Sequence, residues 1–144
     1  MKKPRIFIDS NIWFSAFYKE GVCSKLLRYL HEVSWEIVIS ELVLEEVIRN
    51  IKEKLPQAMA LIVEYFSTIR PTVVKNPLKG ELLVNRGLAP LHDLPILIAA
   101  AQYKCAYFIT GNLKDFKSDL IKRRFRLQII NPSDFLKLLK TRNL

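Results

Sequence analysis

The chain has 144 residues, half of them hydrophobic and 26% charged, a composition that predicts one globular domain, residues 1–144, rather than a disordered chain. Two cysteines are too few for a disulfide scaffold, and the longest apolar run (94–101) is far short of the about 20 residues of a membrane span, so we expect a cytoplasmic protein with no membrane contact. The net charge of +9, with nine basic and three acidic residues from Lys114 onward, favours a polyanion such as RNA as partner, although many basic proteins bind none.

Residues 5–8 (Arg-Ile-Phe-Ile) predict a first buried strand, and Asp9, Ser10 and Asn11 follow it directly. In an open α/β sheet, the C-terminal ends of the strands are where ligands and chemistry gather. Asp9 is therefore a candidate functional carboxylate. It is also a good N-cap for the helix that follows, and this stretch alone leaves both interpretations open.

Apolar periodicity predicts three helices and one strand in the next part of the chain: helix 22–33, strand 35–39, helix 41–54 and helix 57–69. Ser40 can cap the second helix, and Pro56 separates it from the third. The segment that follows is less regular, with a short strand expected at 72–74 and a short helix over 78–88.

Glu46 differs from the other charged residues of the helix over 41–54. Leu42 and Val43, one turn earlier, place it at the border of the buried face, where a carboxylate needs a cation or hydrogen-bond donors unless it reaches solvent. Glu45 and Arg49 are expected to form an exposed i,i+4 pair on the opposite side.

Asp93 stands at a second strong helix start, with Pro95 in the first turn and an almost wholly apolar helix after it. The sequence predicts Asp93 as the N-cap at the mouth of the core, and a functional role is the alternative. The C-terminal part predicts three further elements: strand 107–110, strand 126–130 and a last helix to about residue 139. Strands that alternate with helices and are continuously apolar predict an α/β fold with a mostly parallel sheet covered on both faces.

Acidic residues gather at predicted element ends along one rim of this sheet. Asp9, Asp93 and Asp115 lie there, and Glu46 can reach the same rim. Two carboxylates at ~4 Å repel by roughly 4 kcal/mol at an effective dielectric constant of ~20, so such a cluster needs a cation or protons. Oxygen ligands favour Mg²⁺ or Mn²⁺ over zinc, and an ion held this way can activate water and stabilise charge on a phosphodiester.

Other classes of active site find little support in the sequence. It contains no Gly-x-Gly-x-x-Gly or Walker A motif, and its two histidines, His31 and His92, lack zinc-site spacing. Ser10 lacks a nucleophile elbow, and Asn11 stands where an aspartyl-phosphate hydrolase would have a second aspartate.

Four short motifs, in this order and spacing, resemble those of the PIN-domain family over nearly the whole chain: 7–11 (FIDSN), 40–47 (SELVLEEV), 93–97 (DLPIL) and 108–116 (FITGNLKDF). The resemblance implies a three-layer α/β/α sandwich with about five strands. It also implies a Mg²⁺- or Mn²⁺-dependent endoribonuclease, often a homodimer, and an antitoxin partner where the family member is the toxin of a toxin–antitoxin pair.

The resemblance also implies roles for individual residues. Asp9, Glu46 and Asp93 match metal-binding acids of the family, and the fourth acidic position is either Asp115 or is replaced by Asn112. The supporting polar residues implied are Ser10, Asn11, Thr110 and Asn112. Because of Asn112, a nucleic-acid-binding or regulatory module with a degenerate, non-cleaving site is the alternative function.

Overall fold

The computed structural model describes residues 3–33 and 35–142. In these residues five strands form one sheet in the order β3-β2-β1-β4-β5, and every neighbouring pair is parallel. The strands are β1 (Arg5–Ile8), β2 (Glu36–Ser40), β3 (Thr72–Val74), β4 (Tyr107–Ile109) and β5 (Gln128–Ile130). The expected parallel sheet is confirmed.

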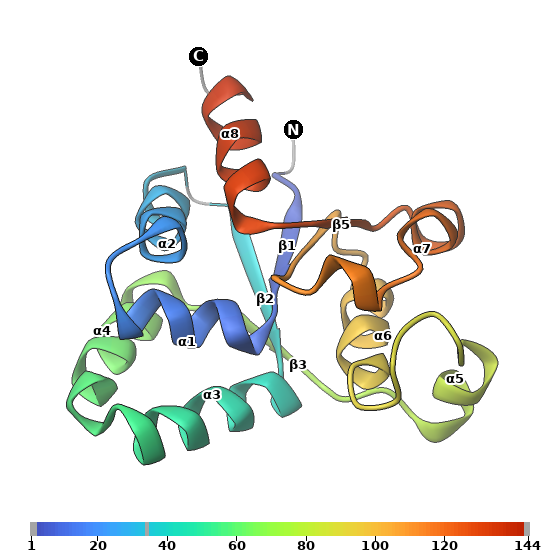
Figure 1. Ribbon diagram of the computed structural model, residues 1–144, viewed down its shortest axis with the longest axis horizontal. Helices are drawn as coiled ribbons and strands as arrows, with labels where there is room; N and C mark the ends of the chain where they lie inside the picture. Colours follow the sequence, from blue (N-terminus) through green and yellow to red (C-terminus); the bar gives the residue numbers. More distant parts are fainter. Residues whose placement is uncertain (1–2, 34, 143–144) are drawn as a thin grey trace.

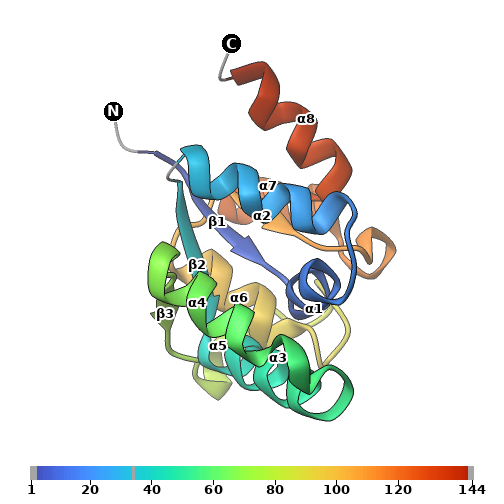
Figure 2. The same ribbon diagram turned by 90° about the vertical axis from the view of Figure 1, so that its left-hand side faces the viewer.

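Helices cover both faces of this sheet. They are α1 (Ser10–Tyr18), α2 (Val22–Val33), α3 (Glu41–Lys54), α4 (Met59–Ile69), α5 (Lys79–Val84), α6 (Leu94–Gln102), α7 (Ser118–Phe125) and α8 (Pro132–Arg142), with short 3₁₀ turns η1 (Pro56–Ala58) and η2 (Leu113–Asp115). Figure 1 shows α1 to α4 on one side of the sheet and α5 to α7 on the other. The last helix, α8, packs against α2 (Figure 2). The α/β/α sandwich is thus confirmed.

The order of the strands positions the site. The chain builds β1, β2 and β3 outward in one direction and then returns to place β4 on the other side of β1. The connections after β1 and β4 therefore diverge to opposite faces, which leaves a crevice at the C-terminal ends of these two strands. Phe7 and Phe108 stack across this pair with ring centroids 5.4 Å apart, which packs the centre of the sheet tightly beneath the crevice.

Several predicted boundaries shift by a few residues. The last strand begins at Gln128 instead of residue 126, because Arg126 ends α7 in the left-handed conformation (φ 57°). The helix expected over 78–88 ends at Val84, ahead of Gly87, whose φ of 92° suits only glycine well. The last helix continues to Arg142, beyond the expected residue 139.

None of the helices in the described part of the chain combines the length and the apolar character that a membrane span requires.

Candidate functional site

Asp9 lies at the C-terminal end of β1, in the crevice between β1 and β4. Its side chain is only 6% exposed. One carboxylate oxygen, Oδ1, accepts a hydrogen bond from the Ser10 amide at 2.8 Å, as expected of the N-cap of α1. The other, Oδ2, accepts a hydrogen bond from the Thr110 hydroxyl at 2.9 Å. Asp9 therefore occupies the N-cap position, one of the two roles that the sequence left open, and is at the same time a carboxylate held from two sides.

Thr110 follows β4 directly and is fully buried. The backbone N–H of Asn112 donates to the Thr110 hydroxyl oxygen at 3.2 Å, so the hydroxyl hydrogen remains available for Asp9. This chain of two hydrogen bonds connects the loop after β4 to the end of β1. It orients the Asp9 carboxylate at the strand ends.

Glu46 comes to the crevice from α3. The Ser40 hydroxyl caps this helix by accepting a hydrogen bond from the Val43 amide at 3.3 Å. Val43 and Val47 pack into the core, which leaves Glu46 half-buried at the edge of the buried face, as the sequence predicted. Its Oε1 is buried and has no hydrogen-bond partner among the described residues. An unpaired buried carboxylate oxygen is unfavourable unless a proton or a cation compensates it.

Asp93 occupies the N-cap position of α6, but its side chain makes no capping hydrogen bond. The amides of Ile96 and Leu97, the third and fourth residues of the helix, bond to the backbone carbonyl of Asp93. The predicted N-cap position of Asp93 is confirmed, but of the two roles left open for its carboxylate the capping bond is not formed, and the half-buried side chain faces other groups. One of its oxygens, Oδ2, lies 3.3 Å from His92 Nε2.

These side chains share one pocket of about 530 Å³ at the C-terminal ends of the strands. It brings together three of the four predicted acids, Asp9, Glu46 and Asp93. The other residues that line it are Ser10, Asn11, Leu42, Arg49, His92, Pro95, Ile96 and Asn112. Asp115, on η2, is exposed and does not line the pocket, whereas Asn112 does.

Burial raises the pKa of all three pocket carboxyls above their ordinary values. For Asp9, the hydrogen bonds from Thr110 and Ser10 partly offset this effect on the pKa. The negative charge of Asp9 further raises the pKa of Glu46, and that of Asp115 raises the pKa of Asp93. The pocket therefore concentrates negative charge that its own hydrogen bonds do not fully stabilise.

The donor chemistry of this pocket fits a hard divalent cation. Three carboxylates line it, and one buried carboxylate oxygen lacks a partner. Within residues 3–33 and 35–142, no three His, Cys, Asp or Glu side chains are grouped closely enough to hold a metal ion together. The pocket thus has carboxylate ligands and negative charge that suit a divalent cation, but the described side chains do not surround a common point as the ligands of a bound metal ion do.

Two polar residues of the pocket lining, His92 and Arg49, were not singled out by sequence. His92 lines it beside Asp93. Arg49 also lines it, so the expected exposed pair with Glu45 on the opposite side is wrong. Helical spacing could have revealed Arg49, because Leu42, Glu46 and Arg49 follow one another at four and three residues and share a face of α3.

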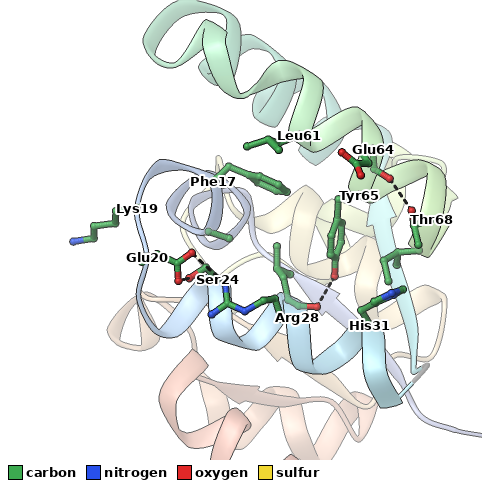
Figure 3. A pocket seen from close by; sticks show the side chains of 13 residues that line it. Phe17, Lys19, Glu20, Ser24, Arg28, His31, Leu61, Glu64, Tyr65 and Thr68 are labelled. Carbon is green, nitrogen blue, oxygen red and sulfur yellow. Dashed lines mark hydrogen bonds and ion pairs between the residues drawn. The ribbon is translucent and has the colours of Figure 1, made fainter.

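A second hollow, of about 610 Å³, lies between α1, α2 and α4 (Figure 3). Several of its polar groups bond to one another or to backbone, and three others, Lys19, His31 and Glu64, are exposed. Glu20 accepts hydrogen bonds from Arg28 at 3.2 Å and from the Ser24 hydroxyl at 3.4 Å. The Tyr65 hydroxyl donates to the Leu27 carbonyl at 2.9 Å. The carboxylates of this hollow, Glu20 and Glu64, are exposed, so among the described residues it contains no buried carboxylate oxygen without a partner.

Comparison with known proteins agrees with this architecture. No curated protein matches the chain. The crystal structure of VapBC2 from Rickettsia felis, bound to a DNA fragment from their promoter, has a similar fold, with a TM-score of 0.62 and 22% identity over 88% of this chain and 98% of that one. The sequence profile of the PIN domain matches residues 6–80, slightly more than half of the chain. The chain thus belongs to the PIN domain family.

Proposed function

We propose that this protein is a divalent-metal-dependent endoribonuclease that uses Mg²⁺ or Mn²⁺. Asp9, Glu46 and Asp93 would hold the ion. The observation that carries this proposal is the convergence of three carboxylates from separate elements on one pocket, with the buried Oε1 of Glu46 left without a partner. When bound, the ion would stabilise negative charge on the phosphodiester and would activate a water molecule.

The protein side chains have separate tasks in this proposal. Thr110 and the Ser10 amide hold the Asp9 carboxylate in a fixed orientation toward the pocket. Asn11 and Asn112 line the pocket and offer polar groups to a water molecule or to the substrate. Asp115 remains the predicted fourth acid and acts on Asp93 through its charge from outside the lining.

RNA is the proposed substrate because the acidic pocket is set in a strongly basic chain of net charge +9. Part of the positive charge lies in the last turn of α7, where Lys122, Arg123 and Arg124 follow one another. Such residues neutralise backbone phosphates irrespective of sequence. We place this activity in the cytoplasm.

We further propose that the protein is the toxin of a toxin–antitoxin pair, with a neutralising antitoxin as partner and a second copy of itself in a homodimer. Membership of the PIN domain family and the similarity in fold to the VapBC2 structure support this assignment. Co-purification of the protein encoded beside this chain, with loss of cleavage in the complex, is the expected result.

The test of the nuclease is RNA cleavage by the purified protein with Mn²⁺ or Mg²⁺ and with EDTA. Asp9→Asn should abolish the metal-dependent cleavage, whereas Asp134→Asn, the same change at an exposed position on α8, should leave it intact. Equal activity in Asp9→Asn and the unmodified protein would contradict the proposal.

A non-cleaving nucleic-acid-binding or regulatory module is the second candidate. The observation that favours it is Asn112, an amide rather than a carboxylate in the pocket lining. Binding of RNA without cleavage at any concentration of Mn²⁺ or Mg²⁺ would support this function over the first.

A further inference from the structure

Arg49 lies at an unusual place for an unpaired cation. It is exposed on α3 and lines the acidic pocket beside Glu46. Glu45 and Glu46 stand four and three residues before it, at the spacings that favour helical ion pairs. Yet the described residues provide Arg49 with no ion pair within 4.0 Å and no side-chain hydrogen bond. All donors of its guanidinium group therefore remain available to an external group.

Arg49 is also the permanently charged cation of the pocket lining. The other basic side chain there, His92, lies 3.3 Å from Asp93 and is charged only when protonated. The charge of Arg49 reaches the acids, because it lowers the pKa of Glu46 against the larger effect of burial. Positive charge is thus placed at the edge of an otherwise negative pocket.

A phosphodiester that enters this pocket meets strong repulsion. An anionic phosphate oxygen close to a carboxylate is repelled more strongly here than in bulk water, because the effective dielectric constant near a protein is lower. A cation at the edge offsets part of this repulsion. The planar guanidinium of arginine matches two oxygens of a phosphate at once, which a lysine ammonium does not.

We propose that Arg49 binds a phosphate of the RNA backbone and thereby positions the strand at the pocket. This inference rests on the proposed function for the identity of the ligand. It makes Arg49 a substrate-positioning residue, distinct from the acids that would hold the ion. The competing role, a counterion that only tunes Glu46, predicts no direct contribution to RNA binding.

The test measures binding of a short single-stranded RNA by the full chain in EDTA, over a range of salt concentrations. Arg49→Gln and Arg49→Lys are compared with Lys52→Gln, which removes the same charge from an exposed position of α3 that does not line the pocket. Glutamine and lysine are good helix formers, so these variants should retain the fold, which circular dichroism checks.

We expect Arg49→Gln to weaken binding about tenfold and to reduce the slope of log affinity against log salt by about 0.7, the value for one phosphate contact on a single strand. Arg49→Lys should keep the slope and lose part of the affinity, because it keeps a point charge without the planar fork. Lys52→Gln should change the affinity much less. In cleavage assays with Mn²⁺, Arg49→Gln should raise KM more than it lowers kcat.

Equal weakening in Arg49→Gln and Lys52→Gln would overturn the inference in favour of a general effect of net charge. Unchanged RNA affinity in Arg49→Gln would overturn it in favour of the counterion role. If Arg49→Gln weakens RNA binding as expected but the unmodified protein never cleaves RNA, the proposed nuclease fails while this inference stands. If the unmodified protein cleaves RNA but Arg49→Gln binds RNA with unchanged affinity, this inference fails while the proposed nuclease stands.

Discussion

The two large hollows of this protein differ in whether their lining includes a buried carboxylate oxygen without a hydrogen-bond partner. The hollow between α1, α2 and α4 is the larger, about 610 Å³ against 530 Å³, but Glu20, Ser24, Arg28 and Tyr65 all have hydrogen-bond partners there. In the strand-end pocket, a buried Glu46 oxygen and the Arg49 side chain have no hydrogen-bond or ion-pair partner among the residues that the structure describes. The proposed site is therefore not the hollow with the larger volume but the one that contains the unpaired buried carboxylate oxygen.

The difference follows from the positions of the two hollows in the fold. The larger one lies among helices on one face, where Glu20 meets Ser24 and Arg28, and Tyr65 reaches the Leu27 carbonyl of another helix. The smaller one lies at the ends of strands from distant parts of the chain, where like charges are brought together. A fold retains such a cluster of like charges only when other interactions compensate for the repulsion. Clusters of this kind are typical of functional sites.

The largest expected contrast is between two glutamates, one in each hollow. Glu46→Gln should lower metal-dependent RNA cleavage by at least about 100-fold, the usual effect of removing one well-placed electrostatic group. Glu64→Gln, in the hollow between the helices, should change it less than about twofold, within the ±0.5 kcal/mol usual for exposed substitutions. Single-turnover kinetics at saturating Mn²⁺ measures both, and similar losses in the two variants would remove the distinction between the hollows.

Thr110→Val should lower the free energy of unfolding by about 1–3 kcal/mol. Valine has nearly the same shape but leaves Oδ2 of the buried Asp9 without its donor. Urea denaturation checks the value. Cleavage should fall as well, because the Asp9 carboxylate is no longer held from the β4 side. A variant with unchanged stability would show that this hydrogen bond does not hold Asp9.

A smaller loss, about 0.5–1.5 kcal/mol, is expected for Tyr65→Phe, which removes the hydrogen bond from Tyr65 to the Leu27 carbonyl. Cleavage by Tyr65→Phe should remain within about twofold of the unmodified protein. A large loss of cleavage with the fold intact would assign chemistry to the hollow between the helices.

The most gradual effect is the dependence of stability on pH in EDTA. Burial raises the pKa of Asp9, Glu46 and Asp93 above their ordinary values of 3.8, 4.5 and 3.8. Between the ordinary and the raised pKa, the folded chain binds more protons than the unfolded chain. The contribution of these carboxyls to the free energy of unfolding therefore grows as the pH falls through that window, and it is lost as the pH rises.

Urea denaturation at several pH values from about 7 down to about 4.5 measures this trend. The lower limit of the pH window lies at the unperturbed carboxyl pKa values. Glu46→Gln should reduce the gain in stability on acidification. An equal gain in Glu46→Gln and in the unmodified protein would show that the Glu46 carboxyl does not contribute to the trend.

Local patterns were sufficient to predict most elements. The strand over 5–8 and the helices over 22–33 and 41–54 occur with the expected bounds, because each has a clear period or a clean apolar run with a cap beside it. The choice of Glu46 over Glu45 as the pocket glutamate also followed from helical periodicity, since only Glu46 borders the buried face.

Contacts between distant segments were beyond local patterns. The hydrogen bond from Thr110 to Asp9 depends on β1 and β4 being neighbours, although 101 residues separate the two side chains in sequence. Asp93 makes no capping bond in a backbone conformation that is helical (φ −91°, ψ −21°) and not the extended one typical of an N-cap, and local sequence does not reveal this. Asp115 lies on the short 3₁₀ turn η2, and its side chain does not line the pocket.

The most direct test of the metal assignment is a titration of Mn²⁺ at neutral pH, followed by thermal or urea unfolding. If the strand-end pocket holds the ion, the unmodified protein should gain about 2.7 kcal/mol at a concentration 100 times Kd. The double variant Asp9→Asn with Glu46→Gln should gain much less, while Glu64→Gln should behave as the unmodified protein. No stabilisation of the unmodified protein at millimolar Mn²⁺, or equal stabilisation of the double variant, would contradict the assignment.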